Sequence, residues 1–263
     1  MDRHPRSNWE RGPKSLNVLP AVETLSNSPD TLRGLLLHVA DLLMPQECFV
    51  CGSLAGGEAV CAPCRAELPN HPAAACPVCA EPTGGGGICG RCQRRRPSFD
   101  ATRAVFDYAF PVHTMLHALK YGHRLALADF FAAELTRLAA DLRLEADVIL
   151  PMPLHPRRLA ERGFNQAVEL ARPLARAVGL PLELGAVRRV RNTVAQVDLD
   201  REARLRNPRG AFTCGASMQG LRIAVVDDVM TTGATLDELA RVLKQQGAAW
   251  VGNFVVARTP VPD

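Results

Sequence analysis

The chain has 263 residues, 47% of them hydrophobic and 22% charged, which is the composition of an ordinary globular protein with room for one sizeable core and a small extra module. The net charge of +4 is too small to require nucleic acid as a partner. Most cations are arginines, which suit bidentate contacts with phosphate, and the only lysines are Lys14, Lys120 and Lys244.

Two features precede the first cysteine. Residues 1–29 are rich in Ser, Asn and Pro and are expected to form a loose tail. Residues 30–45 are expected to form an amphipathic helix that packs on the core or on another domain, with a membrane-surface role as the alternative. The run is too short to span a bilayer and no signal peptide is recognisable, so we expect a cytoplasmic protein without stable membrane insertion. The apolar positions at helical spacing are Leu32, Leu35, Leu36, Val39, Leu42 and Leu43.

Eight of the nine cysteines form four Cys-x-x-Cys pairs, and the last four repeat the first four at an offset of 28 residues. The repeat indicates two copies of one paired-knuckle unit. One such turn supplies two thiolates, and two turns complete a tetrahedral zinc site. Because large apolar residues are few here, zinc would supply the folding energy, on the order of 10–16 kcal/mol per ion. The expected ligands are Cys48, Cys51, Cys61, Cys64, Cys76, Cys79, Cys89 and Cys92.

Residues 46–97 are therefore predicted to be a double four-cysteine module with two structural zinc ions, since four thiolates leave no position for water. The order along the chain favours two sequential sites; a cross-braced arrangement and a single site with degenerate partners are the alternatives. Disulfides are a further alternative, disfavoured because nothing marks the chain for export. Cys214 stands apart and is expected to be a packing residue.

After Pro97 the pattern alternates between strands and helices, which predicts an α/β domain over residues 98–263. Its sheet should be of the parallel type, with ligands at the carboxyl ends of the strands. Pro173 is expected to bend its helix. The expected strands are 104–110, 147–150, 221–226 and 250–257, and the expected helices are 113–120, 125–144, 164–178 and 236–246.

The most specific feature is the run Val225-Val226-Asp227-Asp228-Val229-Met230-Thr231-Thr232-Gly233-Ala234-Thr235. The strand is expected to end at the two aspartates, and residues 231–235 to form a turn that leads into the next helix. Backbone N–H groups, threonine hydroxyls and a glycine at a helix start form a cradle for phosphate. The carboxylates can accept hydrogen bonds from the vicinal hydroxyls of a sugar and orient the hydration shell of Mg²⁺. Together these groups indicate ribose 5-phosphate; the alternative is a helix cap followed by a plain turn.

This run is similar to the phosphoribosyl pyrophosphate signature of type I phosphoribosyltransferases. Residues 151–166 extend the likeness through the string Arg162-Gly163-Phe164-Asn165-Gln166, and residues 188–212 look like a mobile loop through Arg191, Thr193, Gln196, Arg204, Asn207 and Phe212. With the cysteine pairs and Leu119-Lys120-Tyr121-Gly122, the likeness covers about residues 46–258. The chain resembles the ComF family, also called GntX-like: amidophosphoribosyltransferase-related proteins with an N-terminal zinc module, linked to DNA uptake in bacterial competence.

The resemblance implies a type I phosphoribosyltransferase fold and a glycosyltransferase reaction that transfers a pentosyl group from phosphoribosyl pyrophosphate with Mg²⁺. Asp227, Asp228 and Arg162 would be the catalytic residues. Arg158 and Arg162 would neutralise the pyrophosphate; a solvated helix start is the alternative for both, as plain solvation is for the loop 188–209. The expected substrate-binding residues are Asp227, Asp228, Thr231, Thr232, Gly233, Ala234, Thr235, Leu154, His155, Arg158 and Arg191.

Thr231 bears on the acceptor, because purine-salvage relatives that use a carboxylate base carry Asp at this position. Threonine cannot take a ring-nitrogen proton at neutral pH, which disfavours a purine acceptor handled in that way. Three functions stay open: a transferase with an unidentified acceptor, a non-catalytic adaptor or sensor working with DNA-uptake machinery, and a zinc-stabilised module for single-stranded nucleic acid. The third is the least favoured as a sole function, since only 5% of the residues are aromatic.

Overall fold

The computed structural model describes residues 46–141, 144–192 and 208–259. The predicted tail and amphipathic helix, and most of the predicted mobile loop, lie outside these residues. None of the described helices is long and apolar enough to cross a membrane.

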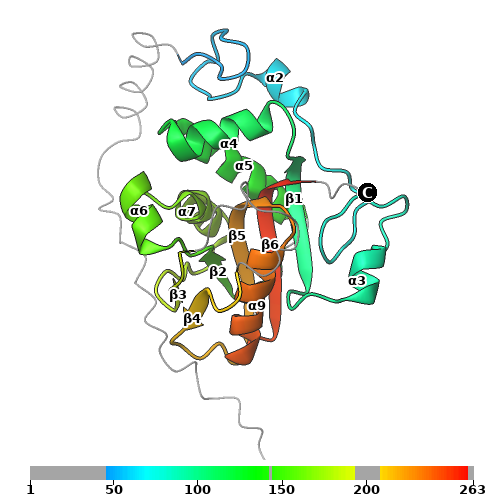
Figure 1. Ribbon diagram of the computed structural model, residues 1–263. Coiled ribbons are helices and arrows are strands. Elements are labelled where there is room, and N and C mark those ends of the chain that lie inside the picture. The colour runs from blue at the N-terminus through cyan, green and yellow to red at the C-terminus, as the bar shows by residue number, and fades with distance from the viewer. Residues whose placement is uncertain (1–45, 142–143, 193–207, 260–263) are drawn as a thin grey trace, which may run out of the picture.

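A four-stranded sheet forms the centre of the molecule (Figure 1). All three strand pairs are parallel, and the strand order is β1-β6-β5-β2. Parallel strands need crossover connections, which helices provide here. The expected sheet of the parallel type is therefore confirmed. Its strands are β1 (Ala101–Asp107), β2 (Val148–Pro151), β5 (Arg222–Met230) and β6 (Trp250–Arg258).

Helices cover both faces of the sheet, so its strands are apolar on both sides. In β5, Ile223 and Val225 point into the core shared with α9, whereas Ala224 and Val226 point into the core shared with α5 and α7. A short antiparallel pair, β3 and β4, lies on the α9 side. The helices of this domain are α4 (Val112–Tyr121), α5 (Ala126–Asp141), α6 (Pro156–Arg162), α7 (Gln166–Val178) and α9 (Ala234–Gln245), and the pair is β3 (Val187–Arg189) with β4 (Phe212–Cys214).

Local sequence signals set several helix ends next to the site. The Asn165 side chain caps α7 by accepting the N–H of Ala167 at 3.0 Å. Gly163 ends α6 with φ of +82°, a conformation that glycine adopts without strain. Helix α6 therefore ends at Arg162 and helix α7 begins at Gln166, and the side chains of these two residues lie close together. Pro173 lies inside α7, as expected.

Two predicted boundaries at the signature run are wrong. Strand β5 does not end at Asp228 but continues to Met230, because the long neighbouring strand β6 pairs with it as far as Met230 and Arg258. Helix α9 begins at Ala234, so the turn covers only residues 231–233. Strand β1 also begins three residues earlier than expected, at Ala101. The helix α6 and the β3–β4 pair had no counterpart in the predicted elements.

The two cysteine units pack on different cores. The first, with helix α2 (Ala62–Ala66), buries Cys48 and Val60 in the core of α4 and α5. The second, with helix α3 (Gly90–Arg94), buries Cys76 and Cys79 in the core of α9. Figure 1 shows α2 beyond α4 at one end of the molecule and α3 beside the β1 edge of the sheet. The predicted boundary after Pro97 falls between α3 and β1.

Candidate functional site

Two adjacent aspartates lie near the carboxyl end of β5, where ligands of parallel sheets bind. The exposed fraction is 8% for Asp227 and 4% for Asp228. The N–H of Asp228 donates to Oδ1 of Asp227 at 2.9 Å. Burial, and after it the neighbouring carboxylate, raise the pKa of Asp227 well above its ordinary value. Asp227 therefore keeps its proton to a higher pH than an exposed aspartate.

Lys120, in the last turn of α4, makes an ion pair with Oδ2 of Asp228. The amide of Gln166 donates to Oδ1 of the same carboxylate at 3.5 Å. Burial acts to raise the pKa of Asp228, but the charge of Lys120 overcomes it and the net pKa is lowered. The pKa of Lys120 is raised in turn, because the attraction of Asp228 outweighs burial. The ion pair therefore favours the ionised form of both Asp228 and Lys120.

Arg162 connects to this network through Gln166. Its Nη1 donates to Oε1 of Gln166 at 2.5 Å, and its guanidinium lies 5.2 Å from the centre of the Tyr121 ring. The first and last residues of the string Arg162 to Gln166 thus form a chain of hydrogen bonds to Asp228. The structure thus brings Arg162 and Asp228 together through one shared side chain, Gln166.

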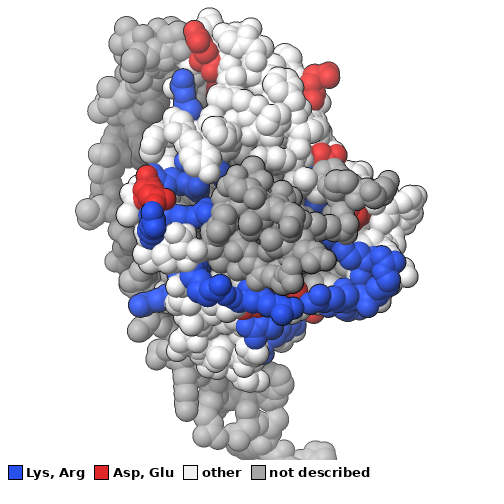
Figure 2. All heavy atoms as spheres, viewed as in Figure 1, with Lys and Arg blue, Asp and Glu red and all other residues white. Residues whose placement is uncertain are grey.

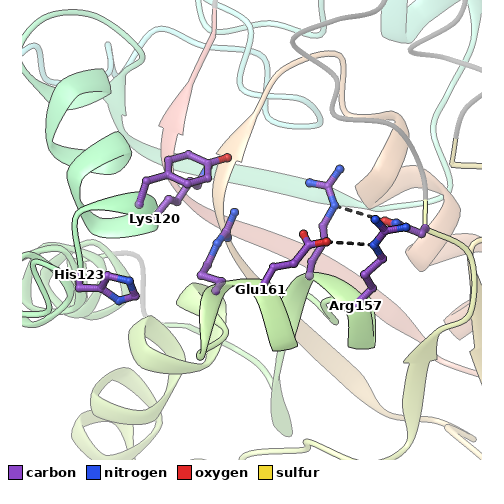
Figure 3. Close-up of a pocket in the computed structure, with 8 residues that line it drawn as sticks. Lys120, His123, Arg157 and Glu161 are labelled. Carbon is purple, nitrogen blue, oxygen red and sulfur yellow. Dashed lines mark hydrogen bonds and ion pairs between the residues drawn. The ribbon is translucent and has the colours of Figure 1, made fainter.

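A cationic cavity of about 440 Å³ adjoins Lys120 (Figure 3). Figure 3 shows Arg157 and Glu161 on α6 facing Lys120 and His123 across this space. Nε of Arg157 pairs with Glu161 at 3.0 Å. An excess of arginines around a cavity suits a ligand with several anionic oxygens, such as pyrophosphate. The lining residues are Lys120, Tyr121, His123, Arg157, Arg158, Glu161, Arg162 and Asn192.

The turn at residues 231–233 presents the N-terminus of α9. Gly233 has φ of +81°, and a Cβ there would lie 2.5 Å from Cε of Met230. Gly233 has no side chain that could cap the helix, and helix N-termini attract anions. Oγ1 of Thr232 accepts the N–H of Ala234 at 3.3 Å and orders the turn. The turn follows directly on β5, the strand that carries the acidic pair.

Among the predicted substrate-binding residues, only Arg158 lines the cavity beside Lys120. Leu154 and His155 are half-buried, and neither is among the described residues that line it. His155 instead caps α6, since its Nδ1 accepts the N–H of Arg157 at 3.2 Å. Arg191 is exposed and donates to the carbonyl of Arg209, so it joins the two described ends of the predicted mobile loop.

Each cysteine unit gathers four Sγ atoms within 4.8 Å of one another. The grouping is sequential, which decides between the predicted arrangements. A tetrahedral Zn–S distance of about 2.3 Å implies S–S distances of about 3.8 Å. Cys51 and Cys61 are 3.8 Å apart, and Cys79 and Cys89 are 3.6 Å apart, so both clusters fit zinc. Cys214 lies outside both groups and bonds the carbonyl of Ala216.

Backbone N–H groups favour the thiolate form of the first cysteine in each cluster. Burial opposes ionisation of Cys48, but backbone N–H groups, first that of Cys61 at 3.4 Å, lower its pKa to about 6. Cys76 has the same arrangement with Cys89, and its pKa is lowered to about 7 despite burial. Backbone N–H donors to sulfur therefore prepare one ligand of each site for metal.

Sequence reasoning missed Lys120, Tyr121 and Gln166 as site residues. Lys120 had a usable signal, because it is one of only three lysines and lies in the string Leu119 to Gly122. No signal in the sequence indicates the pairing of Lys120 with Asp228, because the two residues are far apart in the chain.

Both parts of the chain are similar to known protein families. The double zinc ribbon domain matches residues 39–93, and the phosphoribosyl transferase domain matches residues 164–262. The chain is 38% identical over 162 residues to DNA utilization protein YhgH of Salmonella typhimurium, which covers 59% of this chain and 71% of that protein. It is 30% identical over 170 residues to Competence protein F of Haemophilus influenzae, which covers 61% and 74%. The chain belongs to the ComF family.

Membership of the ComF family confirms the expected fold class: a type I phosphoribosyltransferase fold, with a small N-terminal zinc-binding module built on clusters of four cysteines. Among solved structures, the purine phosphoribosyltransferase of Pyrococcus horikoshii has a TM-score of 0.32 at 20% identity, covering 50% of this chain and 83% of that one. A score this low carries no argument about the substrate of this ComF-family protein.

Proposed function

We propose that the chain binds phosphoribosyl pyrophosphate with Mg²⁺ and acts as a phosphoribosyltransferase. The observation that carries the proposal is the buried Asp227-Asp228 pair, followed at once by the turn at the N-terminus of α9. The N–H groups of the turn would bind the 5-phosphate, and the carboxylates would accept the ribose hydroxyls. The cavity at Arg158 and Arg162 would take the pyrophosphate.

In the proposed reaction, pyrophosphate leaves C1 of the ribose through an oxocarbenium-like state. Arg158 and Arg162 stabilise the negative charge that develops on the leaving group. Mg²⁺, when bound, would neutralise further charge on the pyrophosphate. Thr231 offers no carboxylate base for the acceptor, so the acceptor has to be deprotonated elsewhere or to attack as a neutral amine.

Calorimetry with phosphoribosyl pyrophosphate and MgCl₂ tests binding. We expect a clear heat for the wild type and none for the double variant Asp227→Asn/Asp228→Asn. Undiminished affinity of the double variant would refute the site. Incubation with labelled phosphoribosyl pyrophosphate and a panel of bases, amines and single-stranded DNA then separates two functions. Release of pyrophosphate indicates a transferase, and binding without release indicates an adaptor or sensor.

A second candidate function is binding of single-stranded DNA in support of DNA uptake. Figure 2 shows a band of Lys and Arg side chains across one face of the molecule. Two relatives carry the names DNA utilization protein and Competence protein F, which favours this context. Binding of a labelled oligonucleotide should then weaken steeply as salt rises. We also infer a cytoplasmic location, because zinc ligation needs reduced thiols.

A further inference from the structure

A fully buried arginine joins the second cysteine unit to the phosphate-type turn. Arg258, the last residue of β6, is 0% exposed. On one side its Nε donates to the carbonyl of Cys79 at 3.0 Å, and its Nη2 pairs with Glu81 at 2.6 Å. On the other side its Nη1 donates to the carbonyl of Thr231 at 2.6 Å and to that of Met230 at 3.3 Å. One guanidinium thus holds the backbone of a zinc-ligand segment and the backbone of the turn.

Further contacts join the same two parts. Arg91, which lies between the ligands Cys89 and Cys92, donates to the carbonyl of Thr232 at 3.4 Å. The Phe99 ring packs under Gly233, since Cζ lies 3.7 Å from the place of a Cβ there. The N–H of Ser98 donates to Asp237, in the first turn of α9, at 2.6 Å. The second unit therefore contacts the turn directly at Thr232, through Arg91, while Arg258 and Phe99 link its surroundings to residues 231 and 233.

The first cysteine unit contacts a different part of the fold. Arg65 pairs with Glu134 of α5 at 2.7 Å, and Cys48 lies in the core of α4 and α5. The duplicated units thus serve as internal controls for each other. Cys61 and Cys89 occupy equivalent places: each precedes a five-residue helix, and each is half-buried.

We propose that the second zinc unit positions the turn at residues 231–233 for the 5-phosphate of the ribose, through Arg258 and Arg91, and that the first unit only stabilises the fold. This inference rests on the proposed function of the turn. Zinc fixes the backbone around Cys79, and that backbone fixes the guanidinium of Arg258. A turn that is already ordered loses little conformational entropy when the ligand binds, so the affinity for the ligand is higher. Arg258 and Arg91 are positioning residues in this scheme and do not touch the ligand.

The test compares Cys89→Ser with Cys61→Ser in the full-length zinc-loaded protein. Each variant should lose one zinc. Amide hydrogen exchange at residues 231–235 should be at least about tenfold faster in Cys89→Ser and change less than about twofold in Cys61→Ser. Affinity for ribose 5-phosphate should fall about tenfold in Cys89→Ser only, while affinity for inorganic pyrophosphate changes less than about twofold in both. Equal effects of the two variants, or no effect of either, would overturn the proposal.

A second pair of variants keeps all eight cysteines. Arg91→Gln removes the bond to Thr232 and the contact of Arg91 with the Cys79 sulfur, and Arg65→Gln removes the ion pair of the first unit. Both side chains are half-buried. Ribose 5-phosphate should bind about threefold more weakly to Arg91→Gln and unchanged to Arg65→Gln. Equal affinities of these two variants contradict the role of Arg91.

The exchange measurement needs no ligand, so it separates the two proposals. If the wild type binds no ribose 5-phosphate but Cys89→Ser still exposes the turn, the proposed function fails and the coupling stands. If ribose 5-phosphate binds equally to the wild type and both cysteine variants, the proposed function stands and the coupling fails.

Discussion

At the scale of single residues, the acidic pair shows how one buried charge is tolerated and a second is not. Asp228 has Lys120 as its counter-charge and stays ionised, whereas Asp227 is raised in pKa by burial and by Asp228. A buried carboxylate without a partner is unfavourable, and functional sites commonly retain such groups at the expense of stability. The two aspartates therefore make opposite contributions to the stability of the folded chain.

Opposite effects are expected from Asp227→Asn and Asp228→Asn. A raised folded-state pKa favours the protonated form, so the stability linked to Asp227 is present below the unfolded pKa of about 3.9 and is lost as pH rises through the folded pKa. Asp227→Asn avoids this loss and should raise the unfolding free energy at pH 8 by about 1 kcal/mol, with a smaller gain at pH 5. Urea unfolding at both pH values measures it.

Asp228→Asn should lower the unfolding free energy, because it leaves Lys120 without its counter-charge. Since the folded-state pKa of Asp228 is lowered, its stabilising effect is present above the unfolded pKa and is lost as pH falls through the folded pKa. The stability deficit of the variant should therefore shrink in acid. Stabilisation by both substitutions, or by neither, would contradict the assignment of charge within the pair.

Lys120→Met should destabilise the chain by about 2–3 kcal/mol, because it leaves Asp228 buried and unpaired. The loss is below the 3–5 kcal/mol of fully buried pairs, since the Lys120 side chain keeps 21% exposure. Lys244→Met is the control: Lys244 pairs with Asp100 at 2.7 Å with both side chains more exposed, and its loss should stay below about 1 kcal/mol. Equal losses in chemical unfolding would show that Lys120 is not a structural counter-charge.

The sequence predicted the residues whose signal is local, and missed those defined by contacts across the fold. Asp227, Asp228 and Gly233 lie in one short run with a recognisable order of side chains. Lys120 of α4 meets Asp228 of β5 only in the folded chain, and Arg258 meets Thr231 only through the pairing of β6 with β5. Neither contact has a spacing pattern that a single sequence reveals.

At the scale of elements, contacts between distant parts of the chain also explain why the end of β5 was predicted wrongly. Charged residues normally end a buried strand, which is why the strand was expected to stop at Asp228. The length of β5 is set instead by β6, which offers pairing as far as Arg258. The acidic pair therefore lies within a hydrogen-bonded ladder, which holds both carboxylates in fixed positions. The prediction of a buried strand at residues 223–226 was correct, because helices cover both faces of the sheet there.

The N-terminus of α9 gives a prediction about the turn. Gly233→Ala should cost about 2 kcal/mol, from an alanine with positive φ and from displacement of Met230. Gly179→Ala is the control, since Gly179 has φ of +69° with nothing within 4 Å of a Cβ, and about 1 kcal/mol is expected. Only Gly233→Ala should lose affinity for ribose 5-phosphate, by about tenfold or more. Equal affinity of the two variants would show that the turn is not the phosphate cradle.

At the scale of the whole molecule, the two cysteine units are alike in sequence but differ in their structural surroundings. The two cysteine units share their spacing but are buried to different extents: Cys51 is exposed, whereas Cys76, Cys79 and Cys92 are at most 5% exposed. The offset of 28 residues predicted two copies of one unit, and the structure decides that their ligands group sequentially. The offset could not predict that one unit packs on α5 and the other on the turn before α9, because the partners of each unit lie in the other domain.

The asymmetry predicts two rates of zinc loss. A chelator reaches a metal fastest where a ligand is open to solvent, so zinc at Cys51 should leave before zinc at Cys79. With a coloured chelator in excess we expect about two zinc per chain, released in two phases of equal amplitude that differ at least about tenfold in rate. Cys61→Ser should remove the fast phase and Cys89→Ser the slow one. A single phase in the wild type would mean that the contacts of the second unit do not shield its metal, since the thiolate ligands of the two sites are otherwise alike.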